Sequence, residues 1–271
     1  MKKLAVLEKL DSVAIITMDD PSNANANSTK KIIDELCDVV SDVNADPSIG
    51  AVIFTGAGKV FSSGGEIQLM ESYQPMDPID VRAYYQHQGI HKFYRQLHQL
   101  EIPTIAAVNG PAYGSGFGMA LMCDIRLAAA RATFTMNFAK LGILPGDGGT
   151  MYLLRAVGHQ EAAKIMFTAQ TVDARRAKEI GIVADVFEPQ DLMSAALQLA
   201  HSIASHPKRN MRLMKRLLRH AHTTTDWEAY VDLTVSMQAL AHHTPEHREG
   251  LRRLREHVAA KKKSQTQETQ R

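Results

Sequence analysis

The chain has 271 residues, of which 45% are hydrophobic, and its formal net charge is +2. This length and composition suffice to bury one substantial core, with room for a smaller appended unit. A net charge so close to zero argues against nucleic acid as the main partner, and no apolar run approaches the length of a membrane span.

Cysteine usage and the N-terminal sequence bear on location. Cys37 and Cys123 are far apart and lie in apolar settings, which is typical of reduced thiols. Residues 1–18 begin like a signal peptide, but charges at Glu8 and Asp11 interrupt the apolar run. We therefore expect a cytoplasmic protein that does not contact a membrane.

The first part of the chain predicts a hairpin, a polar loop and a helix. Residues 5–10 and 13–18 are short β-rich runs on either side of the turn-forming pair Asp11-Ser12. A polar loop follows at 19–27, and Ser28 or Thr29 can cap a helix over 30–45.

Two later stretches share one pattern, in which a buried strand runs into a glycine-rich turn and a helix. In the first, a strand over 51–55 leads to TGAG and then to FSSGGE, which carries Gly64 and Gly65. In the second, an apolar run at 105–108 leads to a loop with four glycines and then to a small apolar run at 119–123.

Glycines at such junctions let the backbone approach a ligand closely and leave the first N–H groups of a helix free. Each junction can therefore hold developing negative charge. Three other interpretations compete with this one. A P-loop lacks its Gly-Lys-Ser/Thr ending here, a dinucleotide fingerprint is only half present at 114–116, and the glycines can serve tight packing alone.

Between these stretches, residues 71–80 lose the hydrophobic pattern and predict a mobile segment near the mouth of a site. A long helix over 81–100 follows and carries His87, His91 and His98. His87 and His91 have the spacing of a metal pair, but no third ligand matches them, so we expect solvent-facing histidines and no metal.

The remaining pattern alternates strands and helices, as in a parallel sheet with crossover helices. Strands are predicted at 102–109, 125–129, 133–137 and 182–187, and helices at 151–157, 160–167, 174–179, 192–204, 208–220, 227–240 and 246–260. The last helices have apolar positions at helical spacing, which favours packing against a neighbouring subunit. Residues 261–271 are polar and predict a disordered tail.

Three ordered motifs carry a family resemblance: TGAGKVFSSGGEI, IPTIAAVNGPAYGSGFGMALMCDIRLAA and FAKLGILPGDGGT. With them the chain resembles the enoyl-CoA hydratase/isomerase, or crotonase, superfamily over most of its length, and residues 133–158 look most like the phenylacetate-pathway isomerases. The resemblance implies an α/β fold: a crotonase-like spiral of ββα repeats over 1–200, then a helical region at 201–260 that forms a trimer or a dimer of trimers.

The resemblance also implies how an acyl-CoA thioester binds. The backbone N–H groups of Gly65 and Ser115 form an oxyanion hole for the thioester carbonyl, and His91 or Tyr94 is a candidate to line the acyl pocket. Coenzyme A belongs to the substrate, so no separate cofactor is expected. Its contacts fall on the loop after the second strand and around the hole: Ser22, Asn23, Ala24, Gly65, Glu66, Ile67, Gln68 and Ser115.

Hydratases of this family use two glutamates, one to activate water and one to protonate the α-carbon. At the matching positions this chain has Gly118 and Phe138, and residues 112–120 contain no acid. A glycine cannot move a proton, so we expect plain two-glutamate hydration to be lost.

Asp147 is the acid that remains beside the implied acyl pocket. Family members that shift double bonds, dehalogenate aryl thioesters or isomerise ring-epoxide thioesters often have an aspartate in this turn, although a gapless alignment puts theirs on Gly146. Asp147 is therefore a candidate base, a helix N-cap, or both. Glu66, the other nearby acid, is expected to anchor its loop.

We accordingly predict an isomerase that stabilises a thioester enolate. The alternatives are an enoyl-CoA hydratase or acyl-CoA hydrolase with an atypical acid or base, and a non-catalytic binder of acyl-CoA or RNA. The basic stretches at 208–219 and 248–263 fit a solvated helix face, and they also suit the phosphates of coenzyme A or RNA.

Overall fold

The computed structural model describes residues 2–269, with side chains up to residue 259. The chain forms two compact units, one ending at Lys208 and the other beginning at Arg209. The sequence predicts this boundary after residue 200. The difference arises because helix α8 (Leu192–Ala204) packs on the main sheet and so belongs to the first unit.

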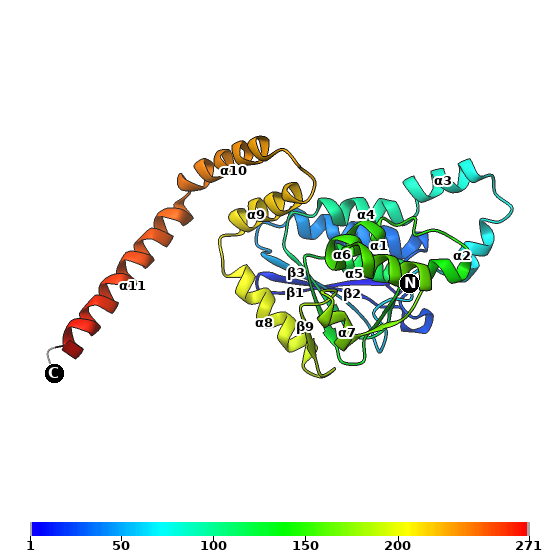
Figure 1. Cartoon of the computed structure of the whole chain (residues 1–271), viewed down its shortest axis with the longest axis horizontal. Helices are drawn as coiled ribbons and strands as arrows, with labels where there is room; N and C mark the ends of the chain where they lie inside the picture. Colours follow the sequence, from blue (N-terminus) through cyan, green and yellow to red (C-terminus); the bar gives the residue numbers. More distant parts are fainter. Residues whose placement is uncertain (1, 270–271) are drawn as a thin grey trace. The chain divides into compact units, whose positions relative to one another are not determined.

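The first unit is built on a six-stranded sheet in the order β1-β2-β3-β4-β6-β9 (Figure 1). β1 and β2 form the predicted antiparallel hairpin, and all other neighbours are parallel. The strands are β1 (Ala5–Leu10), β2 (Val13–Met18), β3 (Ala51–Gly56), β4 (Thr104–Val108), β6 (Ile125–Ala129) and β9 (Asp185–Phe187). A smaller sheet, β5-β7-β8, contains β5 (Ala112–Tyr113), β7 (Thr133–Thr135) and β8 (Val172–Asp173).

Helices cover both faces of the main sheet, which explains why its central strands β3 and β4 are buried throughout. Along β3, Val52 and Phe54 pack into one hydrophobic cluster, whereas Ala51 and Ile53 pack into a second cluster with α8. Figure 1 shows α8 below the sheet and α1, α4, α5 and α6 above it. The helices of this unit are η1 (Pro21–Asn23), α1 (Lys30–Ala45), α2 (Ile67–Ser72), α3 (Pro78–His87), α4 (Ile90–Gln99), α5 (Ser115–Met122), η2 (Asn137–Leu141), α6 (Gly149–Thr168), α7 (Ala174–Glu179) and α8.

The helix predicted over 81–100 is two helices, α3 and α4, which meet at Gly89. A Cβ on Gly89 would lie 2.9 Å from the Cα of Tyr85, so glycine permits the chain to turn back closely on α3. α3 also begins at Pro78, inside the segment that the sequence predicts to be mobile, because Asp77 caps the helix by accepting a hydrogen bond from the Ile79 N–H.

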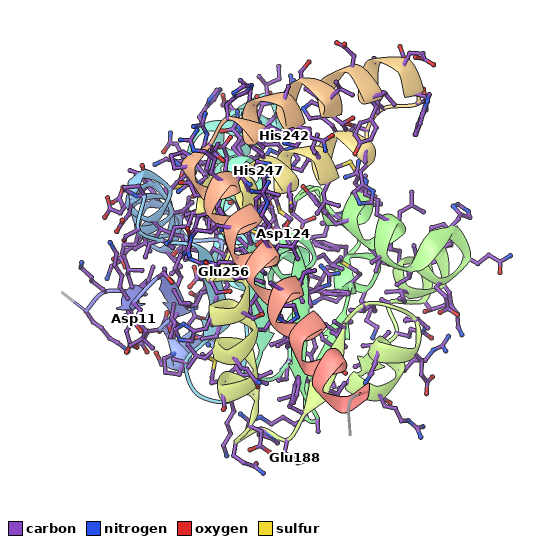
Figure 2. All side chains as sticks on the ribbon, turned by 90° about the vertical axis from the view of Figure 1, so that its left-hand side faces the viewer. Asp11, Asp124, Glu188, His242, His247 and Glu256 are labelled. Carbon is purple, nitrogen blue, oxygen red and sulfur yellow. The ribbon has the colours of Figure 1, made fainter. Side chains whose placement is uncertain are left out.

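The second unit contains all of α9 (Lys208–Ala221) except its first residue, and also α10 (Trp227–His242) and α11 (Pro245–Thr269). At the turn between α10 and α11, His242 Nδ1 and His247 Nε2 are 3.0 Å apart (both residues are labelled in Figure 2). The backbone of α11 is helical to Thr269, where the sequence predicts a disordered tail. Lysine, glutamine and glutamate are good helix formers and explain the difference. Residues 270 and 271 of that tail lie outside the described residues.

Across residues 2–269, none of the helices is both long enough and apolar enough to span a membrane. The parallel order of the main sheet matters more for the site. Because β3 and β4 are parallel neighbours in register at Ile53 and Ile105, their carboxyl ends meet at one edge. The two glycine-rich junctions therefore leave the sheet side by side.

Candidate active site

The loops that follow β3 and β4 pair with each other. Ser62 forms a parallel bridge with Ala112, in which the Tyr113 N–H donates to the Ser62 carbonyl over 2.9 Å. The Ser62 N–H in turn donates to the Pro111 carbonyl over 3.2 Å. Segments about 50 residues apart in sequence thus form one structure at the sheet edge.

Glycine is required where these loops touch. Gly64 has φ +85°, and a Cβ there would lie 2.5 Å from the Tyr113 carbonyl oxygen and 3.0 Å from the Ser115 nitrogen. A Cβ on Gly116 would lie 2.5 Å from the Ser62 carbonyl oxygen. Tight packing, one of the alternatives drawn from the sequence, is therefore a real function of these glycines. It also brings Gly64, the residue before Gly65, against Ser115 at the start of α5.

Two backbone N–H groups at this contact are free. Gly65 precedes α2, and Ser115 is the first residue of α5. Within residues 2–269, neither the Gly65 N–H nor the Ser115 N–H donates to a protein acceptor. Free N–H groups from two adjacent junctions are suited to binding one oxygen that carries negative charge.

Asp147 lies in the turn before α6 and is only 7% exposed. Its Oδ1 accepts a hydrogen bond from the Gly149 N–H, the first of α6, over 2.9 Å. The N-cap residue itself is Gly148, so the interpretation of Asp147 as the N-cap is wrong by one position. Its Oδ2 is buried and has no partner among the described residues. Burial raises the pKa of this carboxyl group, an effect that the Gly149 hydrogen bond opposes.

The free oxygen of Asp147 points at Gly118. A Cβ on Gly118 would lie 2.6 Å from Oδ2, less than any normal contact. The structure therefore brings a carboxylate from the turn before α6 to the position in α5 where the sequence lacks an acid. Phe138, at the other position without an acid, has its ring 3.7 Å from where a Gly114 Cβ would be and is partly buried against the core.

Side chains from α3 and α4 surround Asp147. His91 Nε2 donates to the carbonyl of Gly146, the residue before Asp147, and the Tyr94 hydroxyl donates to the Ser115 carbonyl. Burial raises the pKa of Tyr94 and of Tyr85, and the nearby charge of Asp147 raises both further. Of the predicted candidates, His91 and Tyr94 are thus beside Asp147, while Tyr85 had no recognisable sequence signal.

Tyr85 also belongs to an aromatic group. Its ring centroid lies 5.3 Å from that of Tyr73, 6.5 Å from that of Tyr84 and 6.2 Å from that of His91. No cluster of three or more His, Cys, Asp or Glu side chains that could hold a metal occurs among the described residues.

The predicted coenzyme A loop lies against the first junction. The Ser63 N–H donates to the Ala24 carbonyl over 3.0 Å, and Asn23 Nδ2 donates to Glu66 Oε1 over 3.0 Å. Glu66 therefore ties the two loops together instead of facing Asp147. Ser22 donates to Asp20, and Ile67 and Gln68 begin α2, where Ile67 is 70% exposed.

One residue of this region was missed from the sequence. Asn27 is completely buried; its N–H donates to the Gly64 carbonyl over 3.0 Å, and its Oδ1 accepts from Ser115 Oγ over 2.7 Å. The only signal was a polar residue just before the helix cap, which is indistinguishable from an ordinary loop residue.

The chain is similar in sequence to known proteins. The sequence profile described as enoyl-CoA hydratase/isomerase matches residues 8–265. The short-chain-enoyl-CoA hydratase of Clostridium acetobutylicum is 39% identical over 216 residues, which cover 79% of this chain and 80% of that protein. The 4-chlorobenzoyl coenzyme A dehalogenase-2 of an Arthrobacter species is 34% identical over 226 residues, 81% of this chain and 79% of its own.

Solved structures agree with the fold. The crystal structure of an enoyl-CoA hydratase subunit I from Geobacillus kaustophilus superimposes with a TM-score of 0.86 at 28% identity, over 93% of this chain and 95% of that one. The α/β fold predicted from the three motifs is confirmed.

Proposed function

Because the chain belongs to the enoyl-CoA hydratase/isomerase family, we propose that it isomerises the double bond of an enoyl-CoA thioester, with Asp147 as the base. The N–H groups of Gly65 and Ser115 form the oxyanion hole in this proposal. Family membership makes the chain an acyl-CoA enzyme. The choice of reaction is the further step, and it depends on the acids at the site.

The observation that carries the proposal is the single unpaired carboxylate oxygen. Asp147 Oδ2 is buried, has no protein partner in the described part of the chain and faces Gly118. Hydration by two acids needs a second carboxyl group, and position 138 is a phenylalanine. One carboxylate is enough to take a proton from one carbon of a substrate and return it to another.

The reaction then balances without a further reactant. The Asp147 carboxylate removes a proton from the carbon next to the thioester carbonyl of a 3-enoyl-CoA. The electron pair of that C–H bond moves into the carbonyl, and the resulting dienolate oxygen accepts hydrogen bonds from Gly65 and Ser115. The carboxylic acid returns the proton to the γ-carbon and gives the 2-enoyl-CoA. Loss of one such N–H donor costs about 10²- to 10³-fold in kcat elsewhere.

The burial of Asp147 suits this role. A carboxyl group whose pKa is raised is a stronger base once ionised, and burial of the Asp147 side chain slows exchange of its proton with bulk water between the two steps. The Gly149 N–H that holds Oδ1 fixes the direction of Oδ2.

A second candidate is hydration with one carboxylate. Two observations favour it: Asp147 Oδ2 lies where a side chain at position 118 would begin, and the Clostridium relative is named a hydratase. In this reaction Asp147 removes a proton from water, which adds to the β-carbon, and then protonates the α-carbon.

Turnover of two thioesters separates the candidates. Wild type is incubated with a 3-enoyl-CoA or with crotonyl-CoA in D₂O, and the products are followed by NMR. Isomerisation predicts that the 3-enoyl substrate is converted while crotonyl-CoA is hydrated at least 10²-fold more slowly, with Asp147→Asn inactive. Faster hydration of crotonyl-CoA favours the second candidate. Binding of both thioesters without turnover or deuterium exchange identifies a non-catalytic acyl-CoA binder and rejects both.

A further inference from the structure

Asn27 connects the two junctions of the site, contacting the first through its backbone and the second through its side chain. Its backbone N–H donates to the Gly64 carbonyl over 3.0 Å, and its side-chain Oδ1 accepts from Ser115 Oγ over 2.7 Å. The residue is completely buried. It lies behind the two N–H groups that the proposed function aims at the thioester oxygen.

The first contact sets the direction of the Gly65 N–H. The Gly64 carbonyl and the Gly65 N–H belong to one planar trans peptide, so they point in opposite directions. Two adjacent glycines leave this peptide free to rotate unless something holds it. Because the Asn27 N–H holds the Gly64 carbonyl oxygen toward Asn27, the Gly65 N–H of the same peptide points away from Asn27.

The second contact fixes Ser115 through its side chain. The Ser115 hydroxyl is tied to Asn27, and the Ser115 carbonyl accepts from the Tyr94 hydroxyl. With both its side chain and its carbonyl held, the residue that begins α5 has little freedom to reorient its own N–H. One asparagine therefore contacts both donor-bearing segments.

A buried amide at position 27 is not explained by packing alone. Its Nδ2 faces the Tyr94 hydroxyl, and this contact partly offsets the rise in the Tyr94 pKa that burial causes. A buried amide must be matched by polar partners, whereas leucine, of similar size, has no polar group to satisfy. A polar side chain in this position is explained if its oxygen is needed.

We propose that Asn27 is a positioning residue that holds the Gly65 and Ser115 N–H groups in the directions required to polarise a thioester carbonyl. This inference rests on the proposed function, because it assumes that the two N–H groups form an oxyanion hole. Asn27 itself does not touch the substrate.

The test measures polarisation directly, in the full-length protein, with butyryl-CoA carrying ¹³C at the carbonyl. This saturated probe has no double bond to shift. Infrared difference spectra of wild type are expected to show the carbonyl band displaced to lower wavenumber on binding. Asn27→Leu is expected to lose at least half of that displacement and about 10-fold in kcat, with KM changed less than 3-fold and the melting temperature close to wild type.

Two further variants guard against a purely structural effect. Ser115→Ala keeps the Ser115 N–H but removes the same side-chain hydrogen bond as Asn27→Leu, so a comparable loss of band displacement is expected even if Asn27→Leu does not fold. Asn25→Ala is the matched control. Asn25 is a buried asparagine two residues away whose side chain donates to Ala57 and Val60 carbonyls. It should melt earlier and keep the full displacement.

The outcomes separate the inference from the function. Full displacement in both Asn27→Leu and Ser115→Ala, or an equal loss in Asn25→Ala, overturns the positioning role. No displacement in wild type that binds the probe would mean that no oxyanion hole forms, which rejects the proposed function itself.

Discussion

Gly118 and Asp147 depend on each other across 29 positions of sequence: any Cβ at 118 would lie 2.6 Å from the unpaired Oδ2 of Asp147. The glycine that removes an acid from α5 also makes the space into which another acid reaches from the start of α6. Gly118 and Asp147 therefore form one arrangement, which can be tested by substituting either residue.

Gly118→Ala is expected to lower kcat about 100-fold with little change in KM, since an added methyl group must push the carboxylate aside and displacements of about 1 Å cost this much in oriented reactions. The thioester contacts made by the first junction are unaffected. Steady-state kinetics with the 3-enoyl-CoA measure the change.

A matched substitution controls for the methyl group itself. Gly250 lies in α11, and a Cβ there would meet nothing within 4 Å. Gly250→Ala should therefore retain kcat and stabilise its helix by about 0.5–1 kcal/mol. If Gly118→Ala is as active as this control, Asp147 is not confined by position 118.

Asp147→Asn is expected to separate activity from stability. The variant loses the base and hence turnover, but it also removes a buried charge. Because burial raises the folded-state pKa above the unfolded value, ionisation at neutral pH costs stability. The variant should therefore melt above wild type at pH 7, and this advantage should disappear as the pH falls below about 4, the ordinary aspartate pKa.

Thermal denaturation at a series of pH values checks both halves of this prediction. A variant that melts below wild type at neutral pH would contradict the raised pKa, because the asparagine amide oxygen can still accept the hydrogen bond from the Gly149 N–H.

The acid limb of the pH–rate profile gives an independent measure of Asp147. The base must be ionised, so kcat is present above its pKa and falls as the pH drops through it. With that pKa raised by burial, the limb should lie above the value of about 3.9 for a free aspartate. Circular dichroism at each pH shows whether the protein stays folded, and a limb at or below the free value contradicts the assignment.

Local patterns were enough to predict most of the fold. The predicted strand at 102–109 corresponds to β4, and the small apolar run at 119–123 corresponds to α5. Both could be predicted because a buried strand and a glycine-rich turn are recognisable from residues that follow one another in the sequence. The same is true of the break at Gly158, where α6 leaves helical geometry with φ 74° and where two helices were predicted.

What could not be predicted depends on contacts between distant segments. α8 packs on the main sheet, and its last residue, Ala204, lies very close to Gly50. A Cβ on Gly50 would be only 2.9 Å from the Ala204 Cα. The turn at Gly89, the contacts of Asn27 and the approach of Asp147 to Gly118 have the same character. No periodicity within either segment reports where the other one lies.

Assembly into a trimer or a dimer of trimers remains a prediction from the family resemblance, and Trp227 offers a way to test it. It is the only tryptophan of the chain and is 70% exposed in a single copy. Large apolar side chains are exposed on all three helices of the second unit: Met214, Leu218, Trp227, Val235, Leu240, Leu251, Leu254 and Val258. Such a concentration of apolar surface favours burial against another subunit.

Light scattering on a sizing column should therefore give three or six times the 29.9 kDa chain mass. Leu254→Glu is expected to shift the protein toward monomer and Trp227 emission to longer wavelength, because a charge does not fit an apolar interface. Arg255→Gln, an exposed neighbour on the same helix, is the control and should leave both readings unchanged. Wild type that elutes as a monomer at micromolar concentration rules the assembly out. The exposed apolar side chains of the second unit would then not be explained by contact with another copy of the chain.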